Sequence, residues 1–342
     1  MSPNNPPSAA ILSVSGVRLL PDERQFLAAA NPFGLILFAR NVETPEQVSA
    51  LVQDFRSAVG RADAPVLIDQ EGGRVQRLRP PHWPALAAPG AIARLYERDT
   101  AAASQAARLL GEAIAATVAP LGIDVACAPM ADVRAPGSED KVIGDRAYGA
   151  TPEQVSLLAA KTEQALRAAG IATTPKHAPG HGRATIDSHV SLPRVEADMA
   201  ALQADLGPFK AMTDAPMWMT AHIVYPAIDG GRPATCSPDV LGWLREETGY
   251  RGLIVSDDLA MRALEGPIEA RAAAARMAGC DLLLYCPGDP VGNAEAIAGA
   301  GPADATTIDA WARWTNARAA PSAKDPFALG AELAALLGSD IT

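Results

Sequence analysis

Short apolar runs alternate along the chain with longer segments rich in Ala, Leu and Glu. Uninterrupted apolar runs are typical of strands that are buried on both faces, as in parallel sheets. The longer segments have helical periodicity, for instance at 44–59, 101–119, 152–169 and 267–278. The runs that we expect to form strands are 11–16, 34–39, 65–70, 124–130, 172–177, 217–223, 252–257 and 281–286.

Several of the expected helices carry start or stop signals. Thr44, Thr151 and Ser237 each precede a proline, which places a cap residue before Pro at the first helical turn. Gly170 and Gly279 lie where a helix C-cap belongs. These signals support the alternation of strands and helices.

Eight strands that alternate with helices predict an α/β fold with a parallel sheet. We expect a single (β/α)8 TIM-type barrel with a core over about 11–300, and extra C-terminal helices over 303–342. A doubly wound open sheet is the alternative, but no G-x-G-x-x-G motif follows the first strand. No linker or repeat divides the chain, so we expect one domain over 1–342.

The charge and the termini limit the possible partners. The formal net charge of −10 argues against a nucleic-acid or anionic-membrane surface, which needs clustered Lys and Arg. No apolar run approaches the length of a membrane-spanning helix, and the N-terminus has no basic segment followed by a long apolar stretch. The four cysteines form no C-x-x-C pair and are expected to be free thiols. We therefore expect a cytoplasmic protein.

Polar side chains end four of the expected strands. Barrel active sites lie at the C-terminal ends of strands, so these positions are candidates for an active site. A lone histidine at such a place is often a satisfied core residue, but convergence of several on one rim is harder to explain structurally. The residues are Asp69, Lys176, His177, His222, Asp257 and Asp258, with His181 and His189 in the loop after the fifth strand.

Asp257 is the candidate nucleophile. It ends the apolar run GLIVS, where a carboxylate is costly unless it is paired or functional. Asp258 competes with it, although we expect Asp258 to cap the following helix through backbone N–H groups.

The loop 176–189 is the candidate source of an acid/base. It is rich in Gly and Pro, and we expect it to make few core contacts. Asp187 and His189 are two residues apart, a spacing that lets the carboxylate orient the imidazole and raise its basicity. The alternative is that both simply face solvent.

Arginines near the third and fourth strands are candidates for ligand contact. Arg74 and Arg77 can reach substrate hydroxyls or pair only with Glu71, and Arg146 is a further candidate. No metal site is expected, because a Pro-Gly pair between His177 and His181 prevents the helical spacing of metal ligands.

These motifs resemble glycoside hydrolase family 3, in particular the bacterial cytoplasmic β-N-acetylglucosaminidases of cell-wall recycling. The resemblance extends over about 11–300, and K-H-x-P-G-H-G followed by D-S-H is its most specific part. The matching stretches are 34–41, 68–77, 142–149, 176–182, 187–189, 221–229 and 256–261.

The resemblance implies a function and residue roles. It implies a monomeric, cofactor-free and metal-free retaining enzyme that removes N-acetylglucosamine from 1,6-anhydro-N-acetylmuramic acid, with or without peptide. Asp257 corresponds to the family nucleophile, His189 to the acid/base and Asp187 to its orienting carboxylate. The positions that correspond to sugar contacts are Asp69, Arg77, Arg146, Lys176 and His181.

The chain departs from the family pattern at two loop positions. Ala178 replaces a common phenylalanine, and Arg183 stands where an aspartate often follows G-H-G. Neither departure removes a proposed catalytic group.

Three other functions stay open: a phosphorylase with the same nucleophile, a Schiff-base aldolase that uses Lys176, and a sugar-binding barrel without turnover.

Overall fold

The computed structural model describes residues 6–137, 142–186, 188, 190–320 and 323–338. Its main element is a parallel sheet of nine strands in the order β7-β6-β3-β2-β1-β13-β12-β9-β8. The strands are β1 (Ser8–Leu12), β2 (Pro32–Leu37), β3 (Val66–Ile68), β6 (Val125–Ala126), β7 (Ala172–Thr173), β8 (Lys176–Ala178), β9 (Met217–Thr220), β12 (Leu253–Asp258) and β13 (Leu282–Tyr285). Two hairpins, β4 (Gln70–Gly72) with β5 (Val75–Gln76) and β10 (Val224–Tyr225) with β11 (Asp229–Pro233), lie outside this sheet.

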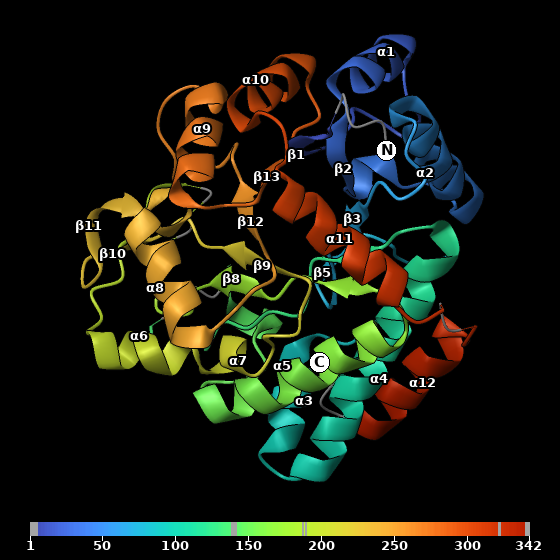
Figure 1. Ribbon diagram of the computed structural model, residues 1–342. Helices are drawn as coiled ribbons and strands as arrows, with labels where there is room; N and C mark the ends of the chain where they lie inside the picture. Colours follow the sequence, from blue (N-terminus) through green and yellow to red (C-terminus); the bar gives the residue numbers. More distant parts are fainter. Residues whose placement is uncertain (1–5, 138–141, 187, 189, 321–322, 339–342) are drawn as a thin grey trace.

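The two ends of the sheet are successive pieces of one chain segment. β7 pairs with β6 and β8 pairs with β9, while only Thr174 and Pro175 separate β7 from β8. The sheet therefore curls, with helices around its outside (Figure 1). The structure agrees in part with the expected eight-stranded barrel. It differs because the run 172–177 is divided into two strands, β7 and β8. Pro175 has no backbone N–H to donate at the break.

Helices follow most strands, as the alternation predicts. Those before β8 are α1 (Pro21–Ala30), α2 (Pro45–Val59), α3 (Pro89–Tyr96), α4 (Thr100–Val118) and α5 (Pro152–Ala168). Those after it are α6 (Met199–Asp205), α7 (Gly207–Lys210), α8 (Pro238–Thr248), α9 (Ile268–Ala278), α10 (Pro290–Ala300), α11 (Ala305–Ala317) and α12 (Pro326–Leu337).

The predicted cap residues have the expected roles. The side chains of Thr44, Thr151 and Ser237 each accept a hydrogen bond from a backbone N–H in the first turn of α2, α5 and α8. Gly279 ends α9 in the left-handed conformation, and Gly170, also with positive φ, directly follows the C-cap of α5. Local side-chain chemistry thus determines where these helices begin and end.

Two expected strands end four residues earlier than predicted. The run 11–16 forms β1 only up to Leu12, because the carbonyl of Val14 accepts side-chain hydrogen bonds from Arg40 and Asn41 instead of pairing in the sheet. The run 124–130 forms a strand only at Val125–Ala126, ahead of Pro129, which has no N–H to donate.

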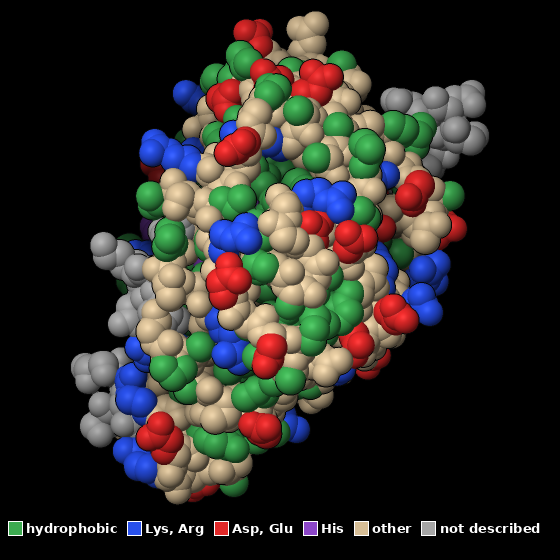
Figure 2. Space-filling model, turned by 90° about the vertical axis from the view of Figure 1, so that its left-hand side faces the viewer, with side chains coloured by type: hydrophobic (Ala, Val, Ile, Leu, Met, Phe, Trp, Pro, Cys, Tyr) green, Lys and Arg blue, Asp and Glu red, His purple; other side chains and the backbone are tan. Residues whose placement is uncertain are grey.

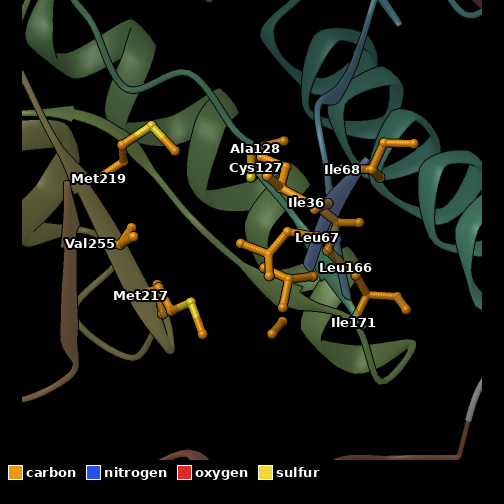
Figure 3. Packing of buried hydrophobic residues seen from close by; sticks show 14 of the residues in the cluster. Ile36, Leu67, Ile68, Cys127, Ala128, Leu166, Ile171, Met217, Met219 and Val255 are labelled. Atoms are coloured by element: carbon orange, nitrogen blue, oxygen red, sulfur yellow. The ribbon is translucent and has the colours of Figure 1, made fainter. Parts of the chain in front are cut away.

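The core lies inside the curled sheet and between the sheet and its helices. Met217, Met219 and Val255 lie on one side and Ile36 and Leu67 on the other, facing one another across the interior (Figure 3). All five side chains are buried, so this interior is a packed core.

The two C-terminal helices close the molecule on different sides. α11 covers the end of the sheet where strands begin, since Trp311 donates its indole N–H to the carbonyl of Asp63, just before β3. Arg318, just after α11, pairs with Asp124 at the start of β6 at 2.9 Å. α12 packs against α4. The end of the sheet where strands finish is therefore left for a site.

The surface carries both signs of charge. On the face seen in Figure 2, acidic and basic side chains are interspersed with apolar and neutral ones. Among the described residues, no helix is long and apolar enough to span a lipid bilayer.

Candidate active site

One cavity of about 280 Å³ opens where the strands finish. Binding sites for drug-sized molecules are roughly 300–1,000 Å³, so this cavity suits a single sugar residue better than a long chain. Nine of the candidate residues from the sequence line it together: Asp69, Arg74, Arg77, Arg146, Lys176, His177, His181, Asp257 and Asp258. Asp187 and His189 lie outside the described residues, but Ser188 between them in the sequence lines the cavity and is buried.

A chain of alternating charges forms one wall of the cavity. Arg77 pairs with Asp69 at 2.9 Å, and the other oxygen of Asp69 accepts from the Lys176 ammonium at 2.9 Å. Lys176 also lies 2.6 Å from Glu71, and Glu71 holds the Arg146 guanidinium through both of its oxygens, at 2.8 and 2.9 Å. Three cations and two carboxylates are thus linked here, with Glu71 outside the cavity lining, and the buried charges compensate one another.

These pairs explain the ionisation of the wall. Burial alone would raise the pKa of Glu71, but Arg146 and Lys176 outweigh it and lower that pKa to about 2. Burial also opposes the charge of Lys176, yet Asp69 and Glu71 raise its pKa above the usual value. Lys176 is therefore a permanent ammonium at neutral pH. A Schiff-base lysine must lose its proton, so this environment argues against the aldolase alternative.

The arginines differ in what they contact. The sequence left open whether Arg74 and Arg77 pair only with Glu71, and neither pairs with it in the structure. Arg77 binds Asp69, Arg74 binds Asp145 at 2.8 Å, and Arg146 is the partner of Glu71.

Asp257 lies at the end of β12 and is nearly buried. Its Oδ1 accepts the backbone N–H of Asp258 at 2.8 Å, and its Oδ2 lies 4.0 Å from Nε2 of His177. Burial would raise the pKa of Asp257, but His177, His222, the Asp258 N–H and Lys176 together lower it. The carboxylate is thus ionised and faces the cavity, as a nucleophile must be.

Asp258 has a different environment. Its Oδ1 accepts the backbone N–H groups of Ala260 and Cys286, and burial raises its pKa to about 6. The expectation that it caps the following helix is wrong, because α9 begins only at Ile268 and a turn follows β12. Asp258 instead joins the end of β12 to the end of β13.

His181 and His222 are both buried but have different roles. Burial lowers the pKa of His181 to about 4, so its ring is neutral at pH 7. Its Nε2 lies 3.4 Å from Ser188 Oγ, and its Nδ1 has no partner among the described residues. His222 is not among the cavity-lining residues; it donates from Nε2 to the carbonyl of Asp258 and accepts at Nδ1 from Thr235. His222 therefore supports the strand end, whereas His181 belongs to the cavity lining.

The start of the loop is more buried than its composition predicts. All residues from His177 to Gly182 are buried. A Cβ on Gly182 would lie 1.8 Å from the carbonyl oxygen of Val133, so only glycine allows this approach. The expectation of few core contacts is wrong for this half of the loop. Arg183 forms a two-point ion pair with Asp205 of α6, with a closest distance of 2.6 Å.

Two residues were not among the site residues expected from the sequence. Glu71 lies one position beyond the strand-like run 65–70, and Asp132 lies two positions beyond the run 124–130. Position at or near a strand end is the signal that identifies them.

Among the described residues, no cluster of three or more His, Cys, Asp or Glu side chains is arranged to hold a metal.

Comparisons with known proteins agree with this arrangement. Residues 10–313 match the glycosyl hydrolase family 3 N-terminal domain. The β-hexosaminidase of Alkalilimnicola ehrlichii is 43% identical over 282 residues, which cover 81% of this chain and 80% of that protein. The β-hexosaminidase of Aromatoleum aromaticum is 35% identical over 339 residues, covering 95% and 91%.

Solved structures extend the similarity to the fold. Native NagZ from Neisseria gonorrhoeae superposes with a TM-score of 0.86 at 30% identity, covering 99% of each chain. Its complex with N-trifluoroacetyl-D-glucosamine gives a TM-score of 0.87 at 30% identity, covering 98% of this chain and 99% of that one.

Proposed function

The chain belongs to glycoside hydrolase family 3 and is a β-N-acetylhexosaminidase, and from this premise we propose that it is a retaining exo-β-N-acetylglucosaminidase. We take its sheet to act as a (β/α)8 barrel closed through 172–178, with the active site at the rim where strands finish. The observation that carries the proposal is the ionised, cavity-facing carboxylate of Asp257 beside the wall of alternating charges.

The proposed reaction is a double displacement. Asp257 attacks the anomeric carbon and forms a covalent glycosyl–enzyme ester as the bond to the leaving oxygen breaks. His189, oriented by Asp187, gives its proton to that oxygen, and the aglycone leaves as an alcohol. His189 then takes a proton from water, whose oxygen attacks the same carbon and releases Asp257. Since an imidazole titrates near pH ~6.5, one histidine can serve as acid and base at neutral pH.

The wall of charges is suited to hold the sugar. Asp69 is an acceptor for hydroxyl groups, while Arg77, Arg146 and Lys176 donate to sugar oxygens. Glu71 lies outside the cavity lining and holds Arg146 and Lys176 in place. We propose that Asp69, Arg77, Arg146, Lys176 and His181 contact the N-acetylglucosamine. The gonococcal relative in complex with N-trifluoroacetyl-D-glucosamine supports a sugar of this type.

The substrate and its setting follow from the resemblance. We propose that the protein removes terminal N-acetylglucosamine from 1,6-anhydro-N-acetylmuramic acid, with or without peptide, in the cytoplasm during peptidoglycan recycling. The cavity, sized for one sugar, supports action at a chain end rather than within a chain.

The decisive experiment is hydrolysis of 4-nitrophenyl N-acetyl-β-D-glucosaminide with EDTA present. We expect turnover by the wild type and none by Asp257→Ala. Undiminished turnover in the variant would show that Asp257 is not the nucleophile. A dependence of turnover on phosphate would identify a phosphorylase, and no turnover by a folded wild type would leave a sugar-binding protein.

A further inference from the structure

One carboxylate of the site, Asp132, lies behind the cavity rather than in its lining. Its side chain is fully buried, between the end of β6 and the start of the loop that follows β8. Oδ1 accepts the backbone N–H of His177 at 3.1 Å and that of His181 at 2.6 Å. Oδ2 lies 2.9 Å from Nδ1 of the His177 ring. All three of these partners belong to the segment 177–181.

The backbone around Asp132 holds the same segment. Ala131 donates to the carbonyl of Lys176 at 2.7 Å, and Ala135 donates to that of Gly182 at 3.1 Å. Gly182 packs directly against the backbone of Val133. The stretch 131–135 is therefore a template along which 176–182 lies, and Asp132 contributes its side chain to this template.

The ionisation of Asp132 decides where the proton of His177 lies. Burial would raise the pKa of Asp132, but His177, His181 and their hydrogen bonds lower it. A carboxylate has no proton to donate, so Nδ1 of His177 carries the hydrogen of the 2.9 Å bond. In the neutral ring Nε2 then bears a lone pair. That atom lies 4.0 Å from Oδ2 of Asp257, and His177 lines the cavity.

We propose that Asp132 is a positioning residue of the active site, which acts through His177. It fixes the tautomer and the direction of the imidazole beside the nucleophile, so that Nε2 meets the bound sugar as an acceptor. Its two backbone hydrogen bonds fix the start of the loop that leads to His189. The proposal rests on the function proposed above and assigns a residue that never touches the substrate.

The substitution Asp132→Asn separates the two roles of Asp132, which are to hold the backbone of the loop and to fix the tautomer of His177. The two backbone N–H groups need the amide oxygen, so the amide NH₂ group faces Nδ1 of His177 and donates to it. The loop stays anchored, but the neutral ring is forced to carry its hydrogen on Nε2. That N–H then points at Asp257, competes with the sugar for this site and weakens the nucleophile.

The first test is spectroscopic and needs no substrate. Long-range ¹⁵N–¹H correlation on histidine-labelled protein distinguishes the two tautomers, and His177→Gln assigns the signal among five histidines. At about pH 8.5 a free imidazole is neutral. We expect hydrogen on Nδ1 in the wild type and on Nε2 in Asp132→Asn. The same tautomer in both proteins would overturn the proposal.

The second test is kinetic. Loss of a carboxylate that fixes a catalytic imidazole costs up to ~10⁴-fold in other hydrolases. His177 is not the proton shuttle, so we expect kcat/KM of Asp132→Asn to fall about 10²-fold on the 4-nitrophenyl substrate, with Tm close to wild type. The double variant Asp132→Asn/His177→Gln should be no slower than His177→Gln alone, because residues that act as one unit are not additive.

Asp124→Asn is the matched control. Asp124 is a buried carboxylate directly before β6, where it holds Arg56 and Arg318, and none of these three residues lines the cavity. We expect it to keep wild-type kcat/KM. Additive losses in the double variant, or wild-type activity in folded Asp132→Asn, would overturn the proposal. An inactive wild type with the expected tautomer shift would refute the proposed function and leave the Asp132–His177 geometry intact.

Discussion

Asp257 and Asp258 are adjacent in the chain, joined by a 2.8 Å hydrogen bond from the Asp258 N–H to Oδ1 of Asp257, yet their carboxyl groups have opposite electrostatic environments. His177, His222, the Asp258 N–H and Lys176 lower the pKa of Asp257 despite its burial, whereas burial raises that of Asp258 to about 6. Two carboxyl groups whose pKa values are separated in this way can have separate roles. The environment therefore favours Asp257 over Asp258 as nucleophile.

Asparagine substitution should separate these two residues. Asp257→Asn removes the nucleophile, and we expect kcat on 4-nitrophenyl N-acetyl-β-D-glucosaminide to fall by roughly 10³-fold or more. Asp258→Asn keeps an oxygen for the N–H groups of Ala260 and Cys286, so its kcat should stay within about 10-fold of wild type. Steady-state kinetics measure both, and the reverse order would assign the nucleophile to Asp258.

The role proposed for His189 predicts a dependence on the leaving group. His189→Ala should lose ~10²–10⁴-fold in rate on a natural sugar leaving group, which must be protonated as it departs. The loss should be much smaller on an activated aryl leaving group. Parallel kcat/KM measurements on both substrates check this, and an equal loss on both would exclude the acid role.

The ion pairs of Glu71 should make stability depend on pH in the acid range. The pKa of Glu71 is lowered from 4.5 to about 2 in the folded protein, so the fold favours the ionised form. Its contribution is complete above about pH 4.5 and is lost as pH falls towards 2. Breaking one partner of a buried ion pair costs about 3–5 kcal/mol, so Glu71→Gln should destabilise the protein by about 3 kcal/mol at pH 7.

Urea unfolding of wild type and Glu71→Gln at several pH values measures this effect. The difference in unfolding free energy should shrink as pH falls from about 4.5 towards 2, since Glu71 is protonated first in the unfolded chain and in the folded protein only near pH 2. A difference that does not change with pH would show that charge is not the cause.

Helix packing provides a prediction independent of the active site. Gly111 of α4 faces α5, where an added Cβ would lie 2.5 Å from the carbonyl oxygen of Thr162. Gly111→Ala should therefore force the helices apart and cost about 1–3 kcal/mol. Gly242 in α8 has nothing within 4 Å of an added Cβ, so Gly242→Ala should stabilise the protein by about 0.5–1 kcal/mol. Thermal unfolding compares them, and equal effects would contradict this view of the α4–α5 contact.

Much of the fold could be predicted because its determinants are local. Thr44, Thr151 and Ser237 begin their helices because each side chain accepts a backbone N–H within its own first turn. The strand predictions were wrong where residues distant in the sequence interact with the predicted strand. β1 ends at Leu12 because Arg40 and Asn41, more than twenty residues away, take the carbonyl of Val14. The strand at 172–177 is divided at Pro175, and only the sheet shows that its halves pair with different neighbours.

By itself, the sequence determined the order of strands and helices, the helix caps and the presence of reactive side chains at strand ends, since periodicity and capping act over a few residues. Only the tertiary structure decided which charges pair and which groups ionise. Lys176 and Asp69 are 107 residues apart, yet lie 2.9 Å from each other. The roles of Asp132 and Glu71 likewise depend on the tertiary structure. Burial, and the distances between groups on separate chain segments, determine whether each group of the site is charged.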